Sequence, residues 1–113
     1  MNKDYTISLE LARELNKAGW KKDTGFWYVW RGEFVLEYFK EKCEEGNGAV
    51  QAPLATEILE ELQNYLIQIE TDINNYRVIF DGDFYEEFND ESLCDALAKL
   101  WICLKNKVIK SDL

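Results

Sequence analysis

The sequence contains no histidine, one proline and three cysteines, none of them in a CxxC pair. Without histidine, a serine or cysteine nucleophile would need a different general base, so nucleophilic catalysis is disfavoured. Cys94 and Cys103 fall in one predicted helix, where about 13 Å of helical rise would separate them, so they cannot bond each other. Together with Cys43 they predict free thiols, as in a reducing cytoplasm.

Long apolar runs are also absent. No segment approaches the roughly 18 consecutive apolar residues of a membrane-spanning helix, and the N-terminal residues lack an apolar run of the signal-peptide type. A phosphate-binding glycine loop is missing too, because Gly46-x-Gly48 has neither a third glycine nor a following helix. We therefore expect a cytoplasmic protein with no membrane contact and no cofactor.

Positive charge is scarce: 22 acidic residues stand against 13 basic ones, and the formal net charge is −9. Such a chain is repelled by nucleic-acid phosphates and by anionic membrane surfaces, so nucleic acid is not an expected partner. An acidic surface suits a basic partner protein. The alternative is that the charge serves solubility alone.

The 113 residues are 47% hydrophobic, which predicts one folded domain over residues 1–113. The clearest element is a helix within Asp90–Val108, because apolar residues recur there every three or four positions. Ser92 and Asp95 have the spacing of a capping box, and Asn89 or Asp90 is an equally good cap. The apolar stripe consists of Leu93, Leu97, Leu100, Leu104 and Val108.

Two further helices are predicted upstream. The first spans Ser8–Ala18, with Ser8 as its N-cap and Gly19 as a left-handed residue that lets Trp20 fold back on Leu15. The second begins with Pro53 at its first position and ends near Asn64. Its apolar side consists of Leu54, Ile58, Leu59, Leu62 and Leu66, and Glu57 faces water.

Alternating residues predict the strands. Gly25–Tyr38 reads as a hairpin that turns at Arg31-Gly32, and Val50–Ala52 as a short edge strand. Three more strands then form a meander, with Asp81-Gly82 as a two-residue turn; they are Tyr65–Glu70, Tyr76–Phe80 and Phe84–Phe88. The order α-β-β-α-β-β-β-α predicts an α+β fold, with an antiparallel sheet of about five strands packed by helices.

Acidic residues supply the candidates for chemistry. The stretch Asp81–Ser92 is the densest in acids, but its glycine stands second and its twelfth residue is serine, which disfavours a calcium loop. Carboxylates on strands are the residues that a glycosidase-like pair would use; those available are Glu33, Glu37, Glu86 and Glu87. Ordinary exposed strand positions are the favoured explanation of these carboxylates, so we expect no catalytic residue and no metal ligand.

The aromatic run Phe26–Trp30 is the most suggestive feature for binding. One face of this strand must pack against a helix, while the other is expected to present Trp27 to a partner. Trp27 and Trp30 are therefore candidate partner-binding residues, with core packing as the alternative. Ile102 is a third candidate, because it falls on the polar side of its helix, where Ala98 and Ile109 would complete a homodimer contact.

Four segments carry a resemblance to a known group of proteins. They are SLELARELNKAGW (Ser8–Trp20), FWYVW (Phe26–Trp30), APLATEILEELQ (Ala52–Gln63) and DALAKLWICLK (Asp95–Lys105). In these segments the chain resembles small uncharacterised proteins encoded by bacteriophages and prophages of Gram-positive bacteria. The resemblance implies a phage accessory protein with an α+β fold, and it transfers no catalytic residues.

Three functions follow from these observations as hypotheses. The first is a non-enzymatic module that binds a host or phage protein through an acidic surface, in one variant by occupying the basic nucleic-acid groove of a host defence protein. The second is a small homo-oligomeric structural protein. The third is a small enzyme that uses strand carboxylates beside Trp27 or Trp30.

Overall fold

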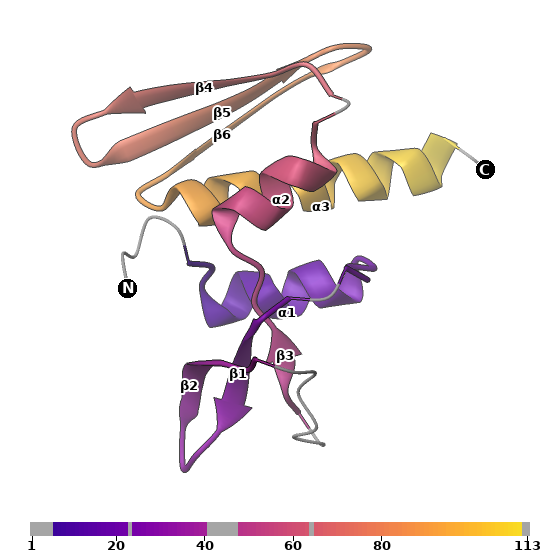
Figure 1. The fold of residues 1–113 in the computed structure, drawn as a ribbon. Coiled ribbons are helices and arrows are strands. Elements are labelled where there is room, and N and C mark those ends of the chain that lie inside the picture. Colours follow the sequence, from indigo (N-terminus) through magenta and orange to yellow (C-terminus); the bar gives the residue numbers. More distant parts are fainter. Residues whose placement is uncertain (1–5, 23, 41–47, 64, 112–113) are drawn as a thin grey trace.

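The computed structural model describes residues 6–22, 24–40, 48–63 and 65–111, with side chains as far as residue 106. These residues form an α+β fold with three helices and six strands (Figure 1). In chain order the elements are α1 (Leu9–Lys17), β1 (Phe26–Trp30), β2 (Phe34–Tyr38), β3 (Val50–Gln51), α2 (Ala55–Glu61), β4 (Ile67–Asp72), β5 (Asn75–Asp81), β6 (Tyr85–Asp90) and α3 (Leu93–Ser111).

The strands form two sheets, so the prediction of one five-stranded sheet is wrong. Sheet A has the order β2-β1-β3 and sheet B the order β4-β5-β6, and every pairing within them is antiparallel. The buried residues of α3 spread over about 200° of its circumference at 3.6 residues per turn. Sheet B covers only part of this surface, and α1 and α2 cover the rest. These helices stand between α3 and sheet A, so the strands do not join in one sheet. The buried residues of α3 are Cys94, Ala96, Leu97, Ala98, Leu100, Trp101 and Leu104.

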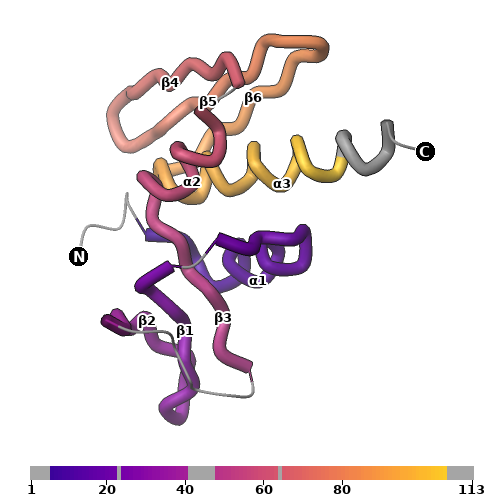
Figure 2. Tube along the Cα trace, turned by 45° about the vertical axis from the view of Figure 1, so that its right-hand side comes forward, coloured from indigo at the N-terminus to yellow at the C-terminus, as the bar shows by residue number. Residues whose placement is uncertain are grey.

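The elements stack in layers around α3 (Figures 1 and 2). On one side α3 packs against β5 and β6 of sheet B, and on the other it packs against α1 and α2. Sheet A lies beyond α1, which contacts β3. Phe26, Tyr28 and Leu36 of sheet A pack against the same buried core. The two sheets are therefore joined through helices.

The ends of α1 are those that the sequence predicts. The hydroxyl of Ser8 accepts a hydrogen bond from the backbone N–H of Leu11 at 3.4 Å. At the other end Gly19 has a φ of 106°, and the N–H groups of Gly19 and Trp20 donate to the carbonyls of Asn16 and Leu15, both at 3.2 Å. This is the Schellman ending. It turns Trp20 into the core, where its ring lies 5.3 Å from that of Trp101.

Replacing Gly19 with alanine is expected to lower the free energy of unfolding by about 1–2 kcal/mol, because a Cβ is strained at positive φ. No atom lies within 4 Å of the position that this Cβ would take, so the cost comes from the backbone alone. Urea denaturation followed by circular dichroism measures the difference. Lys21→Ala, at an exposed neighbouring position, is the control, and equal stability of the two variants would contradict the backbone account.

The second predicted helix needs a correction at its start. Pro53 does not occupy the first helical position, because α2 begins at Ala55 with Leu54 as its N-cap. Leucine has no polar side chain, so the cap is supplied by Glu57, whose carboxylate accepts from the N–H of Leu54 at 2.9 Å and from the hydroxyl of Thr24 at 2.7 Å. Glu57 is therefore half-buried rather than facing water. The predicted stop at Asn64 lies outside the described residues.

Sheet B also differs in detail from the prediction. Leu66 was expected on α2 but precedes β4, where it is 80% exposed. The turn between β5 and β6 contains three residues, Gly82 to Phe84, since Asp81 pairs with Tyr85. The Phe84 ring packs 4.9 Å from that of Phe80, and a Cβ on Gly82 would lie 2.6 Å from the Phe80 ring. This packing favours the longer turn over the predicted two-residue one.

Among the described residues, no helix combines the length and the apolar composition that crossing a membrane requires.

Candidate functional site

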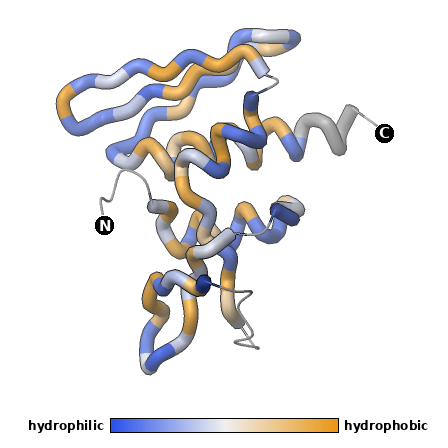
Figure 3. The backbone as a smooth tube through the Cα atoms, viewed as in Figure 1, coloured by the Kyte–Doolittle hydropathy of each residue, from blue (hydrophilic) through white to orange (hydrophobic). Residues whose placement is uncertain are grey.

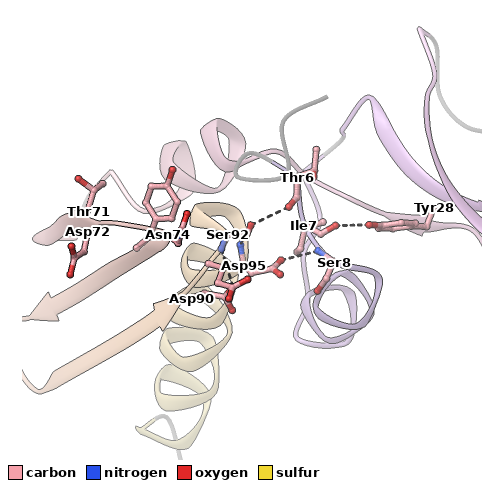
Figure 4. A pocket seen from close by; sticks show the side chains of 12 residues that line it. Thr6, Ile7, Ser8, Tyr28, Thr71, Asp72, Asn74, Asp90, Ser92 and Asp95 are labelled. Carbon is pink, nitrogen blue, oxygen red and sulfur yellow. Dashed lines mark hydrogen bonds between the residues drawn. The ribbon is translucent and has the colours of Figure 1, made fainter.

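A groove of about 760 Å³ opens between sheet B and the start of α1 (Figure 4). It lies between the chain leading into α1, the junction of β6 with α3, and the turn from β4 to β5. We call it the junction groove. Its lining residues are Thr6, Ile7, Ser8, Tyr28, Thr71, Asp72, Asn74, Tyr76, Asp90, Glu91, Ser92 and Asp95.

One wall of the groove joins α1 to α3 through Asp95. The hydroxyl of Ser92 accepts from the N–H of Asp95 at 3.3 Å, which makes Ser92 the cap of α3. The Asp95 carboxylate, predicted as the second half of the capping box, accepts from the N–H of Ser8 at 2.8 Å, while the N–H of Ser92 donates to Asp90 at 3.0 Å (Figure 4). Ser8 is itself the cap of α1. One carboxylate therefore fixes the start of one helix against the start of another.

Two further hydrogen bonds hold the chain before α1 in this wall. The hydroxyl of Tyr28 donates to the carbonyl of Ile7 at 2.6 Å, and the hydroxyl of Ser92 donates to the carbonyl of Thr6 at 3.4 Å (Figure 4). Burial raises the pKa of Tyr28 above its usual range, and the nearby Asp95 adds to the effect. Tyr28 therefore stays a neutral donor at physiological pH.

The pKa values of the two half-buried carboxylates of the groove shift in opposite directions. Burial raises the pKa of Asp95, and the charge of Asp90 adds to this, while its hydrogen bonds with Ser8 oppose it. Burial would raise the pKa of Asp90 as well. However, the Lys99 ammonium at 2.7 Å and the N–H of Ser92 at 3.0 Å hold the Asp90 pKa below its usual value. Asp90 is thus a firmly ionised anchor.

The opposite wall comes from sheet B. Asp72 ends β4, and its carboxylate accepts from the N–H of Ile73 at 2.7 Å, which helps to form the turn. Asn74 has a φ of 59°, a left-handed conformation that asparagine tolerates. With Glu91, the groove carries four carboxylates, and none of the described residues that line it is lysine or arginine. Such a surface attracts cationic groups.

The structure does not bring the three predicted partner-binding residues together. Trp27 and Trp30 lie on opposite faces of β1. Trp27 is half-buried and its indole N–H donates to the carbonyl of Thr24 at 3.1 Å, whereas Trp30 is 61% exposed beside Phe34. Ile102 lies on α3 and borders neither tryptophan.

The prediction for the surroundings of Ile102 is partly wrong. Ala98 is fully buried and cannot take part in a homodimer contact, and the side chain of Ile109 lies outside the described residues. Ile102 itself is half-buried and packs against the core, because α3 is covered on several sides. It borders a second groove of about 380 Å³, together with Leu11, Glu14, Phe88, Lys99, Cys103 and Asn106.

The strand carboxylates proposed for an enzyme are divided between the sheets. Glu37 lies in sheet A and pairs with Arg31 at 3.2 Å, while Glu87 lies in sheet B and pairs with Arg77 at 2.8 Å. Neither these residues nor Glu33 and Glu86 line the junction groove. Of the carboxylates that do meet there, Asp90 and Glu91 belong to the acidic stretch Asp81–Ser92, Asp95 reads in the sequence as half of a capping box, and Asp72 reads as a turn residue.

Two of the cysteines can be placed. Neither Cys94 nor Cys103 takes part in a disulfide bond within the described residues, as predicted. Cys94 is buried, its thiol donates to the carbonyl of Pro53 at 3.4 Å, and burial strongly raises the pKa of the thiol. Cys94 is thus an unreactive core residue. Cys103 is half-buried, and Cys43 lies outside the described residues.

Comparison with known proteins adds no relative. The chain significantly matches no protein-family model, no curated protein and no solved structure.

Within the described residues, no three cysteine or carboxylate side chains converge as a metal site requires. The site therefore rests on its own geometry: an acidic groove whose walls are held by hydrogen bonds.

Proposed function

We propose that the chain is a non-enzymatic protein-binding module, a phage or prophage accessory protein that receives a basic segment of a host or phage protein in the junction groove. The observation that carries this proposal is the unbalanced charge of the groove. Four carboxylates line it, and among the described residues only Asp90 of these four forms an ion pair, with Lys99. Lysine and arginine side chains are the cationic groups that a protein partner would offer.

Two of the four groove carboxylates already accept hydrogen bonds that hold the fold together, and this favours binding over catalysis. Asp90 accepts hydrogen bonds through both oxygens, and Asp95 holds Ser8. A general acid or base must exchange its proton during the reaction, whereas these two groups stabilise the fold through the same atoms. Asp72 and Glu91, which are exposed at the rim, are the groups available to a ligand. An enzyme that uses strand carboxylates remains the weaker alternative.

A short oligo-arginine peptide tests the proposal by NMR titration of the full chain. We expect the amide signals of the groove residues to shift together as peptide is added. The apparent affinity is expected to fall as salt is added, because the ion pairs at the rim are screened.

The matched variants separate the groove from the overall charge. Asp72→Asn with Glu91→Gln should weaken binding about 3- to 10-fold, since exposed ion pairs contribute about 0.2–1 kcal/mol each. Glu33→Gln with Glu61→Gln removes the same charge from exposed positions elsewhere and should leave binding nearly unchanged. Equal weakening by both pairs, or shifts spread evenly over the surface, would refute the groove as the binding site.

A further inference from the structure

β4 forms one of the two edges of sheet B, and it is more exposed than β2 at the edge of sheet A. β4 pairs with β5 on one side only, and five of its six residues are exposed. Edge strands are usually protected by charged side chains, lysine above all, by proline, by a bulge or by short length. β4 carries Glu70 and Asp72 but no lysine or proline, and its pairing with β5 is unbroken from Ile67 to Asp72. β2, one edge of sheet A, is half-buried at four of its five residues.

Apolar side chains gather along this edge. Four of the seven large hydrophobic side chains that are exposed in the described structure lie on β4 or beside it: Tyr65 (39%), Leu66 (80%), Ile69 (38%) and Ile73 (87%). Figure 3 shows the apolar residues alternating along β4 and recurring in the turn to β5. Ile69 belongs to the core-facing side of sheet B, opposite the buried Val78. Ile69 is exposed because α3 packs against β5 and β6, so the core-facing side of β4 extends past the helix.

The backbone pattern defines how another strand can pair here. Asp72 pairs with Asn75 across a two-residue turn, so this is the last hydrogen-bonded pair of the hairpin. Alternation then directs the N–H and C=O groups of Ile67, Ile69 and Thr71 towards the free edge. An incoming strand would bond to these three residues.

We propose that this edge binds a second copy of the chain, through antiparallel pairing of β4 with β4 about a two-fold axis at Ile69. In this register Ile69 faces Ile69 of the second copy, and Ile67 faces Thr71. Gln68 faces Glu70 of the second copy. Within one chain the side-chain amide of Gln68 already donates to the Glu70 carboxylate at 3.3 Å. Extension of the register brings Tyr65 towards Ile73, so exposed apolar side chains cover one another.

Charge complementarity selects β4 for self-pairing. No like charges stand directly opposite in the register about Ile69, and Glu70 lies 3.1 Å from Arg77, a partner that it shares with Glu87. Self-pairing of β6, the other edge of sheet B, places acids against acids. A two-fold axis at Glu87 opposes the two Glu87 side chains, and an axis at Phe88 opposes Glu86 to Asp90. Like charges directly opposite destabilise such pairs.

Sedimentation equilibrium of the full chain, from low micromolar to near-millimolar concentration, tests the dimer. The expected result is a monomer–dimer equilibrium. Ile69→Lys should raise the dissociation constant at least about tenfold, because two like charges would then face each other at the axis. Tyr85→Lys, which changes an exposed aromatic at the opposite edge of sheet B, should leave it unchanged. Circular dichroism of each variant verifies that the monomer is folded.

Amide hydrogen exchange tests the register separately. As the dimer forms, exchange at Ile67, Ile69 and Thr71 should slow at least about tenfold, because their N–H groups become bonded. The backbone N–H groups of Gln68 and Glu70 point towards β5 in the same alternation and already donate to it, so their exchange rates should change little. A monomer at every concentration, a dimer that persists in folded Ile69→Lys, or protection confined to other residues would each overturn the proposal. Ile69 does not line the junction groove, whereas Thr71 and Asp72 at the end of β4 do. The dimer is therefore measured without peptide, and Ile69→Lys, which leaves the groove carboxylates unchanged, tests the pairing separately from peptide binding.

Discussion

Leu97→Ala is expected to lower the free energy of unfolding by about 2–5 kcal/mol, the range for removing a fully buried leucine. Leu97 has no exposed surface and lies in the second turn of α3. Because the core cluster to which it belongs takes side chains from sheet B, α1 and α2, no single element is expected to move and fill the cavity. Urea denaturation, followed by tryptophan fluorescence and by circular dichroism, measures the loss.

Leu66→Ala provides the matched control. It makes the same chemical change at a side chain that is 80% exposed, so its effect should stay within about 0.5 kcal/mol. A loss at Leu97 no larger than that at Leu66 would mean that α3 is not the centre of the core. Both variants are compared at a concentration where the chain is monomeric, because Leu66 adjoins β4.

Asp95→Ala has the second large expected effect, a loss of about 1–3 kcal/mol, because the N–H of Ser8 then loses its partner in a partly buried place. Asp95→Asn retains an oxygen that can accept this hydrogen bond and should cost much less. The comparison of alanine with asparagine isolates the hydrogen bond from the charge. If the two variants are equally unstable, the 2.8 Å contact between Ser8 and Asp95 does not join the helices.

The difference in stability between the natural chain and Asp95→Asn is expected to depend on pH, with a sign that follows from the pKa of Asp95. Folding raises the pKa of Asp95, so its protonated form is favoured in the folded chain. The resulting stability is fully present below the unfolded pKa and is lost as the pH rises through the folded one. Asp95→Asn lacks this titration. The stability of the natural chain relative to Asp95→Asn should therefore decline as the pH rises from strongly acidic values towards neutrality, as urea denaturation at each pH would measure.

The local elements could be predicted from the sequence because their causes are local. Ser8 and Gly19 define α1 through side-chain capping and backbone freedom within one turn. The division into two sheets has no such local cause. It depends on α1 and α2 packing on the side of α3 that sheet B leaves open, and residues such as Ala98, which read as part of a polar side, are buried there. Alternation along a strand does not identify its neighbour.

The junction groove was hidden from sequence reasoning for a related reason. Its residues come from four separate parts of the chain, and they meet only after α1, sheet B and α3 have packed. Asp95 had a complete local explanation as half of a capping box, so nothing in the sequence indicated that it would bond to Ser8. The turn at Asp72 likewise looked like ordinary turn chemistry. The one available signal was the excess of acids around the start of α3.

The central claim is that α3 joins both sheets into one cooperative core. Urea unfolding of the monomer, followed residue by residue by NMR, tests it most directly through Val29 in sheet A, Val78 in sheet B and Leu97 in α3, which are all buried. The account predicts one shared midpoint for the three residues. Loss of the native Val29 signal at a clearly lower urea concentration, while Val78 and Leu97 remain folded, would contradict it.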